Sequence, residues 1–391
     1  MAMAIFEKLL PAMRQVESVV FSGIGEPLMH PRLPEMIRLA KRHADKTAWV
    51  GVQTNGSLLH RTMAESLVAA GLDRICISID SNVSALYRDL RSGGDLEDTG
   101  RAFFSLQAAK ERLRDSFCAI GIEFVVMKRN YTQLPAVLEW AAERGADFAI
   151  VSQLIPYDAA AIDQTMSSTN TDVVKQFFQS WKKRADREKI DIDEIFAVRW
   201  KYQKSKREQR LIDFMEEMEA EAYSRSIPFH LHHLLADEEP LFEQLAAVFR
   251  EARQVADGSG LELRLPRIYP KHDRQCEFVE EGSAFVSWKG EVHPCYFLWH
   301  RYSCYINGKR KRVAEKSFGN VERQDLQAVW NSEPFENFRN TVLRYEYPYC
   351  GSCKIGPCNL VEDDTFDHDC HTIEVPCGQC PWCFGLLQCL R

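Results

Sequence analysis

The sequence predicts an α/β protein with three parts: a parallel sheet covered by helices, a charged helical segment and a cysteine-rich module. Short apolar stretches alternate with amphipathic ones from the start of the chain to about residue 156. Residues 157–265 are rich in charge and have the periodicity of surface helices. Of the 13 cysteines, all but Cys76 and Cys118 lie at or beyond position 276. We therefore expect three domains, with the bounds 1–156, 157–265 and 266–391.

In the first domain, each expected strand is a continuous apolar run, and an expected helix separates one strand from the next. Strands of this kind, joined by crossover helices, are typical of a parallel sheet. Such a sheet is either open and doubly wound or closed into a barrel. The expected strands are 19–22, 49–53, 74–80, 119–127 and 148–156, and the expected helices are 34–43, 61–70, 99–115 and 134–144. In the helical segment, amphipathic helices are expected at 173–181, 207–224 and 240–257.

Polar stretches follow the first three expected strands. They are GIGEP (23–27), TNG (54–56) and SIDS (78–81). Each stretch alone is also typical of an ordinary turn, because glycine, asparagine and proline are common at strand ends. The carboxyl ends of parallel strands lie on one rim of a sheet, and that rim is where ligands bind. The coincidence of the three stretches therefore favours a shared ligand site.

The composition argues against two kinds of partner. The formal net charge is −7, whereas surfaces that bind nucleic acid carry a basic patch that neutralises phosphates. The sequence contains no run of about 18 apolar residues, so we expect no membrane-spanning helix. The first ten residues also lack the pattern of a secretion signal. We therefore expect a soluble, cytoplasmic protein with no nucleic-acid or membrane partner.

The cysteines of the last domain have spacings typical of metal ligands. One group lies at 350–358 and another at 377–383, and both contain cysteines separated by two residues, which can bind one metal centre. In a reducing compartment, such groups more commonly bind metal than form disulfides. Iron–sulfur clusters take four cysteines each, so two clusters would use eight of them. We favour iron–sulfur clusters, with structural zinc and disulfides as the alternatives.

The order of these motifs resembles that of radical S-adenosylmethionine (SAM) enzymes, in which a glycine-rich turn precedes strand ends such as TNG and SID. The cysteine-rich module resembles the SPASM extension, which holds auxiliary [4Fe-4S] clusters. The matching segments are GEVHPC (290–295), FGNV (318–321) and VWNSEPFENFR (329–339). A further resemblance is to the tungsten-cofactor oxidoreductase maturases. It lies in VVMKRN (125–130), VSQLIPY (151–157), CEFVEEGSAFVSWKGEVHPCY (276–296) and CGQCPWCFGLLQC (377–389).

The resemblance implies a partial (β/α)6 radical SAM barrel lacking its first strand, followed by the helical segment and a SPASM iron–sulfur domain. The residues that it implies bind SAM are Gly23, Gly25, Glu26, Pro27, Asn55, Ser78 and Asp80. Asp80 is explained equally well as the N-cap of the following segment. The SPASM pattern implies up to two auxiliary clusters, one on Cys276, Cys295 and Cys370 and the other on Cys350, Cys353, Cys358 and Cys389. Four more cysteines can complete either site: Cys304, Cys377, Cys380 and Cys383.

The function that the resemblance implies is a maturase that modifies a protein or peptide by 5′-deoxyadenosyl radical chemistry. Its substrate would belong to the maturation of a tungsten-pterin enzyme, an aldehyde:ferredoxin oxidoreductase. A low-potential electron donor, such as ferredoxin or flavodoxin, would be a second partner.

One departure from the family pattern is serious. Radical SAM enzymes carry a CxxxCxxC motif upstream of the glycine-rich turn, and its three thiolates hold the cluster that binds SAM. The first cysteine of this chain is Cys76, which the alternation of residues 74–80 places in the core. The resemblance implies either an N-terminally truncated sequence, which we favour, or a natural variant without the cleavage chemistry. The alternative function is a catalytically inactive iron–sulfur scaffold or an electron-transfer partner protein.

Overall fold

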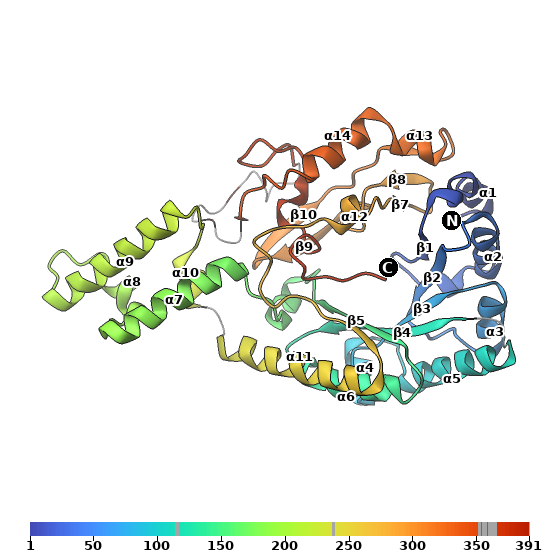
Figure 1. Cartoon of the computed structure of the whole chain (residues 1–391), viewed down its shortest axis with the longest axis horizontal. Helices are drawn as coiled ribbons and strands as arrows, with labels where there is room; N and C mark the ends of the chain where they lie inside the picture. Colours follow the sequence, from blue (N-terminus) through green and yellow to red (C-terminus); the bar gives the residue numbers. More distant parts are fainter. Residues whose placement is uncertain (114–116, 237–238, 351–352, 354–357, 359–365, 391) are drawn as a thin grey trace.

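The computed structural model describes residues 1–113, 117–236, 239–350, 353, 358 and 366–390 (Figure 1). Its central element is a six-stranded sheet in which the strands lie side by side in sequence order and all neighbours are parallel. The predicted α/β class is thus confirmed. The strands are β1 (Ser18–Phe21), β2 (Trp49–Thr54), β3 (Arg74–Ser78), β4 (Ala119–Val126), β5 (Phe148–Gln153) and β6 (Glu262–Arg264).

Helices cover the outer face of this curved sheet (Figure 1). Alternate residues of a strand point to opposite faces, so Val50 and Val52 of β2 and Ile75 and Ile77 of β3 pack in the core under the helices. The covering helices are α2 (Leu33–His43), α3 (Arg61–Ala69), α4 (Ser84–Leu90), α5 (Leu96–Arg112), α6 (Leu134–Ala142) and α11 (Glu239–Ser259). The chain begins with α1 (Met3–Glu7) and the short 3-10 helix η1 (Leu10–Gln15).

The end of the expected helical segment belongs to the sheet. β6 pairs with β5, with Phe148 opposite Glu262, and α11 packs alongside α6. The sequence placed residues 239–264 in the second domain because α11 is amphipathic and β6 is only three residues long. In the structure, these residues instead form the last helix and the last strand of the domain that contains the sheet.

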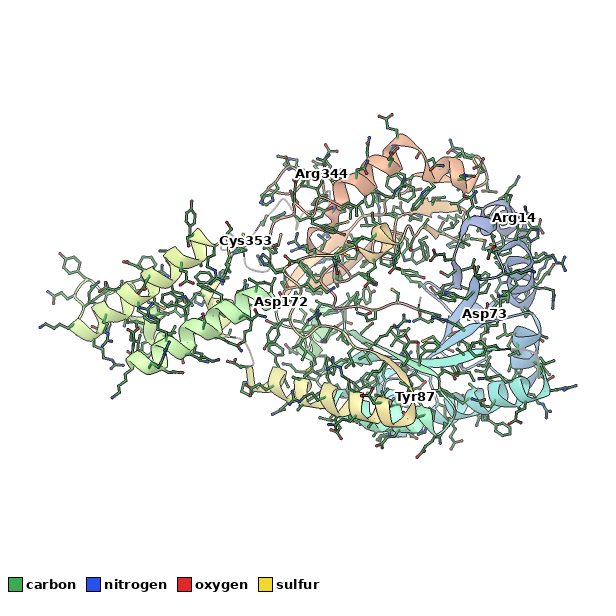
Figure 2. All side chains as sticks on the ribbon, in the orientation of Figure 1. Arg14, Asp73, Tyr87, Asp172, Arg344 and Cys353 are labelled. Carbon is green, nitrogen blue, oxygen red and sulfur yellow. The ribbon has the colours of Figure 1, made fainter. Side chains whose placement is uncertain are left out.

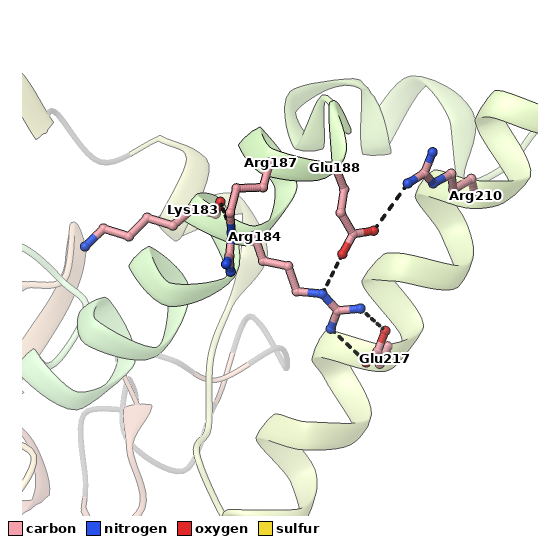
Figure 3. Close-up of polar contacts among 6 residues, drawn as sticks. All are labelled: Lys183, Arg184, Arg187, Glu188, Arg210 and Glu217. Atoms are coloured by element: carbon pink, nitrogen blue, oxygen red, sulfur yellow. Dashed lines mark hydrogen bonds and ion pairs between the residues drawn. The ribbon is translucent and has the colours of Figure 1, made fainter.

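The remaining part of the segment forms a separate helical lobe with its own apolar core, which projects from the body of the molecule (Figure 1). Its helices are α7 (Asp172–Glu188), α8 (Ile195–Val198), α9 (Lys206–Ser224) and α10 (Leu231–Leu235). Arg184 of α7 joins two helices on the lobe surface (Figure 3). Its guanidinium donates two hydrogen bonds of 2.7 Å to Glu217 of α9 and one of 2.8 Å to Glu188. Within the described residues, every helix is too short or too polar to span a bilayer.

The cysteine-rich module is a set of short elements beside the open face of the sheet. Ile5 and Leu9, near the start of the chain, pack against its core, so the module also contacts the N-terminal segment. Its elements are α12 (Glu277–Glu280), β7 (Phe285–Val286), β8 (Glu291–His293), β9 (Tyr302–Ile306), β10 (Lys309–Val313), β11 (Gly319–Asn320), α13 (Leu326–Trp330), α14 (Glu333–Val342) and η7 (Pro376–Gln379).

The C-terminal tail runs across the inner face of the sheet. The backbone N–H of Gln153 donates to the carbonyl of Leu386 at 2.9 Å, and the N–H of Gln388 donates to Ser152 Oγ at 3.0 Å. Leu390 packs with Cys76 and its neighbours on this face. The tail therefore fixes the module to the carboxyl half of β5.

Candidate functional site: a rim of polar loops beside two groups of thiols

The glycine-rich turn after β1 is held open by its backbone conformation. Gly23 and Gly25 have φ values of +139° and +109°, in the region that favours glycine. No heavy atom lies within 4 Å of where a Gly25 side chain would begin, so that side of the turn is free space. Pro27 begins a short 3-10 helix, η2 (Pro27–Met29), immediately after the turn.

Glu26 links the turn to the loop after β2. Its Oε1 accepts hydrogen bonds from the Leu28 N–H at 3.0 Å and from Thr54 Oγ1 at 2.6 Å. Its Oε2 accepts one from the Asn55 N–H at 2.8 Å. Thr54 Oγ1 in turn accepts from the Gly56 N–H at 3.0 Å. The carboxylate of Glu26 thus acts as a brace between two loops of the rim.

Asn55 lies on this rim, but its side chain serves its own loop. Its Oδ1 accepts from the N–H and the hydroxyl of Ser57, at 2.9 and 2.8 Å. This is an Asx-type turn, a common way for asparagine to stabilise a loop. Asn55 itself is exposed, so its amide nitrogen remains at the surface of the rim.

Asp80 binds the end of β3 to the loops around it. Its Oδ1 accepts from the Val125 N–H at 2.8 Å, and its Oδ2 lies 2.7 Å from Arg91 Nε. That N–H is not aligned for a hydrogen bond, so the contact is an ion pair. The N-cap interpretation is wrong, because α4 has Val83 at its N-cap and no side-chain cap. The Asp80 side chain is 7% exposed, which marks it as a buried structural acid.

Glu123 is a residue of the site that the sequence reasoning missed. It lies opposite Ser78 in the register of β3 and β4, and Gln53 of β2 donates to its carboxylate. Part of the residue reaches solvent, yet burial is the main cause that raises its pKa to about 7, followed by the charge of Asp80. The signal in the sequence was an acid at an alternating position within the apolar run of residues 119–126.

The module closes over the rim through aromatic residues. Tyr296 Oη lies 2.8 Å from Ser22 Oγ, directly before the glycine-rich turn. Burial raises the pKa of Tyr296 to about 12, so the phenol is neutral. The ring of Phe285 is 3.8 Å from where a Gly23 side chain would begin and packs edge-on against Tyr296. The cysteine module therefore forms one wall of the space above the rim.

Five cysteines converge in the core of the module, and we call them the inner thiols. Burial and the nearby sulfurs of Cys380 and Cys276 hold the pKa of Cys295 well above its usual value. A hydrogen bond with Cys383 lowers the pKa of Cys276, and hydrogen bonds with Cys276 and Cys380 raise that of Cys383. The inner thiols, each 3–6% exposed, are Cys276, Cys295, Cys377, Cys380 and Cys383.

A second set, the outer thiols, lies nearer the surface. Burial is the first cause that raises the pKa of Cys350 to about 11, and Cys370 and Cys353 act in the same direction. Burial and then Asp369 and Cys358 raise the pKa of Cys370. In the view of Figure 2, Cys353 lies where the module approaches the helical lobe. The outer thiols are Cys350, Cys353, Cys358 and Cys370.

This grouping differs from the one that the SPASM pattern implied. Cys370 belongs with the outer thiols, not with Cys276 and Cys295. Cys389 accepts a hydrogen bond of 3.0 Å from Trp382 Nε1 and lies near Tyr296, outside the outer thiols. The physical reason is the path of the chain, since η7 turns residues 377–383 into the module core and the tail then carries Cys389 toward the sheet.

The number of thiols fits iron–sulfur clusters of four cysteines each. None of the 13 cysteines forms a disulfide. Within the described residues, no three His, Cys, Asp or Glu side chains are spaced to hold one ion. The inner set offers five thiols for four ligand positions, and the outer set offers four.

Two family models match the chain. Residues 2–141 match the model of the radical SAM superfamily. Residues 276–354 match the SPASM model, which is described as an iron–sulfur cluster-binding domain. The first match covers the rim and β1 to β4, and the second covers the module up to Cys353.

Individual proteins are also similar to the chain. The "tungsten-containing aldehyde ferredoxin oxidoreductase cofactor-modifying protein" of Pyrococcus furiosus is 28% identical over 381 residues, which cover 96% of this chain and 84% of that protein. A probable GTP 3′,8-cyclase of Methanococcus maripaludis is 28% identical over 178 residues, 43% of this chain and 56% of that protein. The solved structure of Streptococcus suis SuiB bound to S-adenosylmethionine has a TM-score of 0.49 and 14% identity, covering 91% of this chain and 66% of that one.

Proposed function

Because the chain belongs to the radical SAM superfamily and carries a SPASM domain, we propose that it acts in the maturation of a tungsten-containing aldehyde ferredoxin oxidoreductase. The substrate would be that enzyme, its cofactor-bearing form or a peptide. The similarity to the Pyrococcus furiosus cofactor-modifying protein carries this proposal, because it extends over 96% of the chain and so includes the rim, the lobe and the module together.

The rim is the proposed SAM site. The turn with Gly23, Gly25 and Pro27 would bind the methionine end through its backbone, since no side chain shields it on the Gly25 side. Asn55 and Ser78 would contact the carboxylate or ribose. Glu26 and Asp80 would take part by holding the loops in place, because their carboxylates already have partners within the protein. When bound and reduced, SAM supplies a 5′-deoxyadenosyl radical.

The inner and outer thiols are the proposed sites of two auxiliary [4Fe-4S] clusters. Four of the five inner thiols would hold one cluster in a core that excludes water, and the four outer thiols would hold the other. Electrons would come from a low-potential donor such as ferredoxin or flavodoxin. Cys389, beside Tyr296, lies outside both of these proposed ligand sets.

One observation also fits a second candidate function, because the model that matches residues 276–354 is described as an iron–sulfur cluster-binding domain. A scaffold or electron-transfer protein would need the auxiliary clusters alone. The two candidates differ in whether 5′-deoxyadenosine is formed.

The test is co-production with the tungsten enzyme in an anaerobic host that lacks its own copy of the chain. We expect aldehyde oxidation only when the chain is present. That activity should be lost when Cys276 and Cys383 are both changed to Ser, which leaves three inner thiols, but not with Cys118→Ala, a buried cysteine of the helix-covered core. Equal activity of the tungsten enzyme without the chain would refute the proposal. Full activity without 5′-deoxyadenosine would favour the scaffold.

A further inference from the structure

Two basic side chains are buried in the module between the inner and outer thiols. Arg274 is 5% exposed and Lys311 is 4% exposed. Within the described ranges, neither lies at ion-pair distance from a carboxylate. A buried charge without a counter-charge is strongly unfavourable, and an arginine in a protein does not lose its proton. The charged guanidinium of Arg274 therefore needs negative charge nearby, and a charged Lys311 would need it as well.

Arg274 has more hydrogen-bond donors than the described residues around it accept. Its Nη2 donates to the carbonyl of Pro348 at 2.7 Å, whereas Nε and Nη1 are buried and have no partner among the described residues. Aromatic rings surround the guanidinium, with centroids at 4.5 Å for Tyr349, 5.1 Å for Phe384 and 5.8 Å for Tyr347. Rings alone do not satisfy the N–H groups of these two nitrogens.

The position of Arg274 points to the missing partner. Tyr349 precedes the outer thiol Cys350, and Phe384 follows the inner thiol Cys383. The guanidinium thus lies between two aromatic residues, one next in sequence to an outer thiol and the other next to an inner thiol. Negative charge at Cys350 and Cys383 would favour the charged guanidinium, whereas burial, the largest influence, lowers its pKa.

Lys311 lies on β10 of the hairpin formed by β9 and β10. It stands opposite Cys304 in the register of β9 and β10. Its Nζ donates to Gln379 Oε1 at 3.1 Å, and Gln379 directly precedes the inner thiol Cys380. Arg274 and Lys311 therefore both lie beside the thiols of the module.

We propose that Arg274 and Lys311 are the counter-cations of the auxiliary clusters and that they raise the reduction potentials of both. The inference rests on the proposed function in one respect, that the thiols hold iron and sulfide. A cluster bound by four thiolates is anionic, and each one-electron reduction adds one more negative charge. A fixed cation in a medium of low dielectric constant stabilises the reduced form more than the oxidised form.

The experiment compares full-length variants purified without oxygen, by iron and sulfide analysis and by redox titration followed by electron paramagnetic resonance. Arg274→Met and Lys311→Met remove a charge with little change in length, Arg274→Lys keeps the charge, and Lys289→Met removes an exposed one. We expect each buried substitution to Met to disfavour cluster reduction about tenfold, which is a shift of about 59 mV to lower potential for one electron. Arg274→Lys should recover most of this shift, and Lys289→Met should have none.

The outcomes separate this inference from the proposed function. Unchanged potentials in Arg274→Met and Lys311→Met, with normal iron and sulfide, would overturn the inference alone. Loss of iron in Arg274→Met that Arg274→Lys prevents would support the requirement for charge. Equal loss of iron in both Arg274 variants would assign the residue a packing role and overturn the inference. A wild-type chain that holds no iron and sulfide would overturn both proposals.

Discussion

Replacing Glu26 by glutamine tests whether its carboxylate braces the rim or faces a ligand. The carboxylate accepts three hydrogen bonds, from the Leu28 N–H, Thr54 Oγ1 and the Asn55 N–H. In Glu26→Gln, one oxygen still accepts from Leu28 and Thr54, but an amide NH2 now faces the N–H of Asn55. A hydrogen bond to a charged acceptor contributes about 1.5–3 kcal/mol, so we expect the loop after β2 to lose about 2 kcal/mol of local stability.

The loss is measurable by hydrogen exchange of the peptide that covers residues 52–58. A change of about 2 kcal/mol corresponds to roughly 30-fold faster exchange of its protected amides. Thr54→Val should accelerate exchange by at least as much, because Thr54 is 2% exposed and its hydroxyl also accepts from the Gly56 N–H. Thr54→Ser keeps the hydroxyl and is the matched control.

A double variant decides whether the two residues act together. Since Glu26 and Thr54 share one hydrogen bond, Glu26→Gln with Thr54→Val should cost less than the sum of the single changes. The reasoning is refuted if Glu26→Gln leaves the exchange of residues 52–58 unchanged while affinity for SAM, measured by equilibrium dialysis, falls. That result would show that the carboxylate is free to bind the ligand.

Three further predictions concern the thiols, the sheet interior and the wall above the rim. Changing Cys377 and Cys383 together to Ala, which leaves three inner thiols, should remove about four irons per chain, and so should Cys370→Ser. The combined variant should remove both sets, because the residues belong to different clusters; non-additive losses in iron analysis would restore the grouping implied by the sequence. The pKa of Glu123 is raised to about 7 in the folded protein, so its contribution to stability is complete below pH 4.5 and is lost as the pH rises through about 7. Urea midpoints should fall between pH 5 and pH 8 in the wild type, with a smaller fall in Glu123→Gln; equal falls would show that Glu123 titrates normally. Tyr296→Phe and Ser22→Ala should each destabilise contact between module and rim by about 1 kcal/mol, and their effects on urea unfolding should not add if the 2.8 Å hydrogen bond is formed.

The sequence by itself determined the sheet and its rim. The apolar runs at β2 to β5 are local patterns, and so are the polar stretches that follow β1, β2 and β3, which makes their positions predictable without tertiary information. β6 was missed because Glu262–Arg264 is short and polar and becomes a strand only where β5 offers an edge. The helix α11 could not be distinguished from the helices of the lobe because it is amphipathic, as they are.

The number and spacing of the cysteines also predicted an iron–sulfur module, because thiols separated by two residues can bind one centre wherever they occur. Their division into inner and outer thiols was decided only by the tertiary structure, since Cys276 meets Cys383 across more than a hundred residues of chain. The roles of Glu26, Asp80 and Arg274 were decided in the same way. A charged side chain has the same appearance in a sequence whether it meets water, a ligand or a buried partner, and only the folded chain fixes which of these surrounds it.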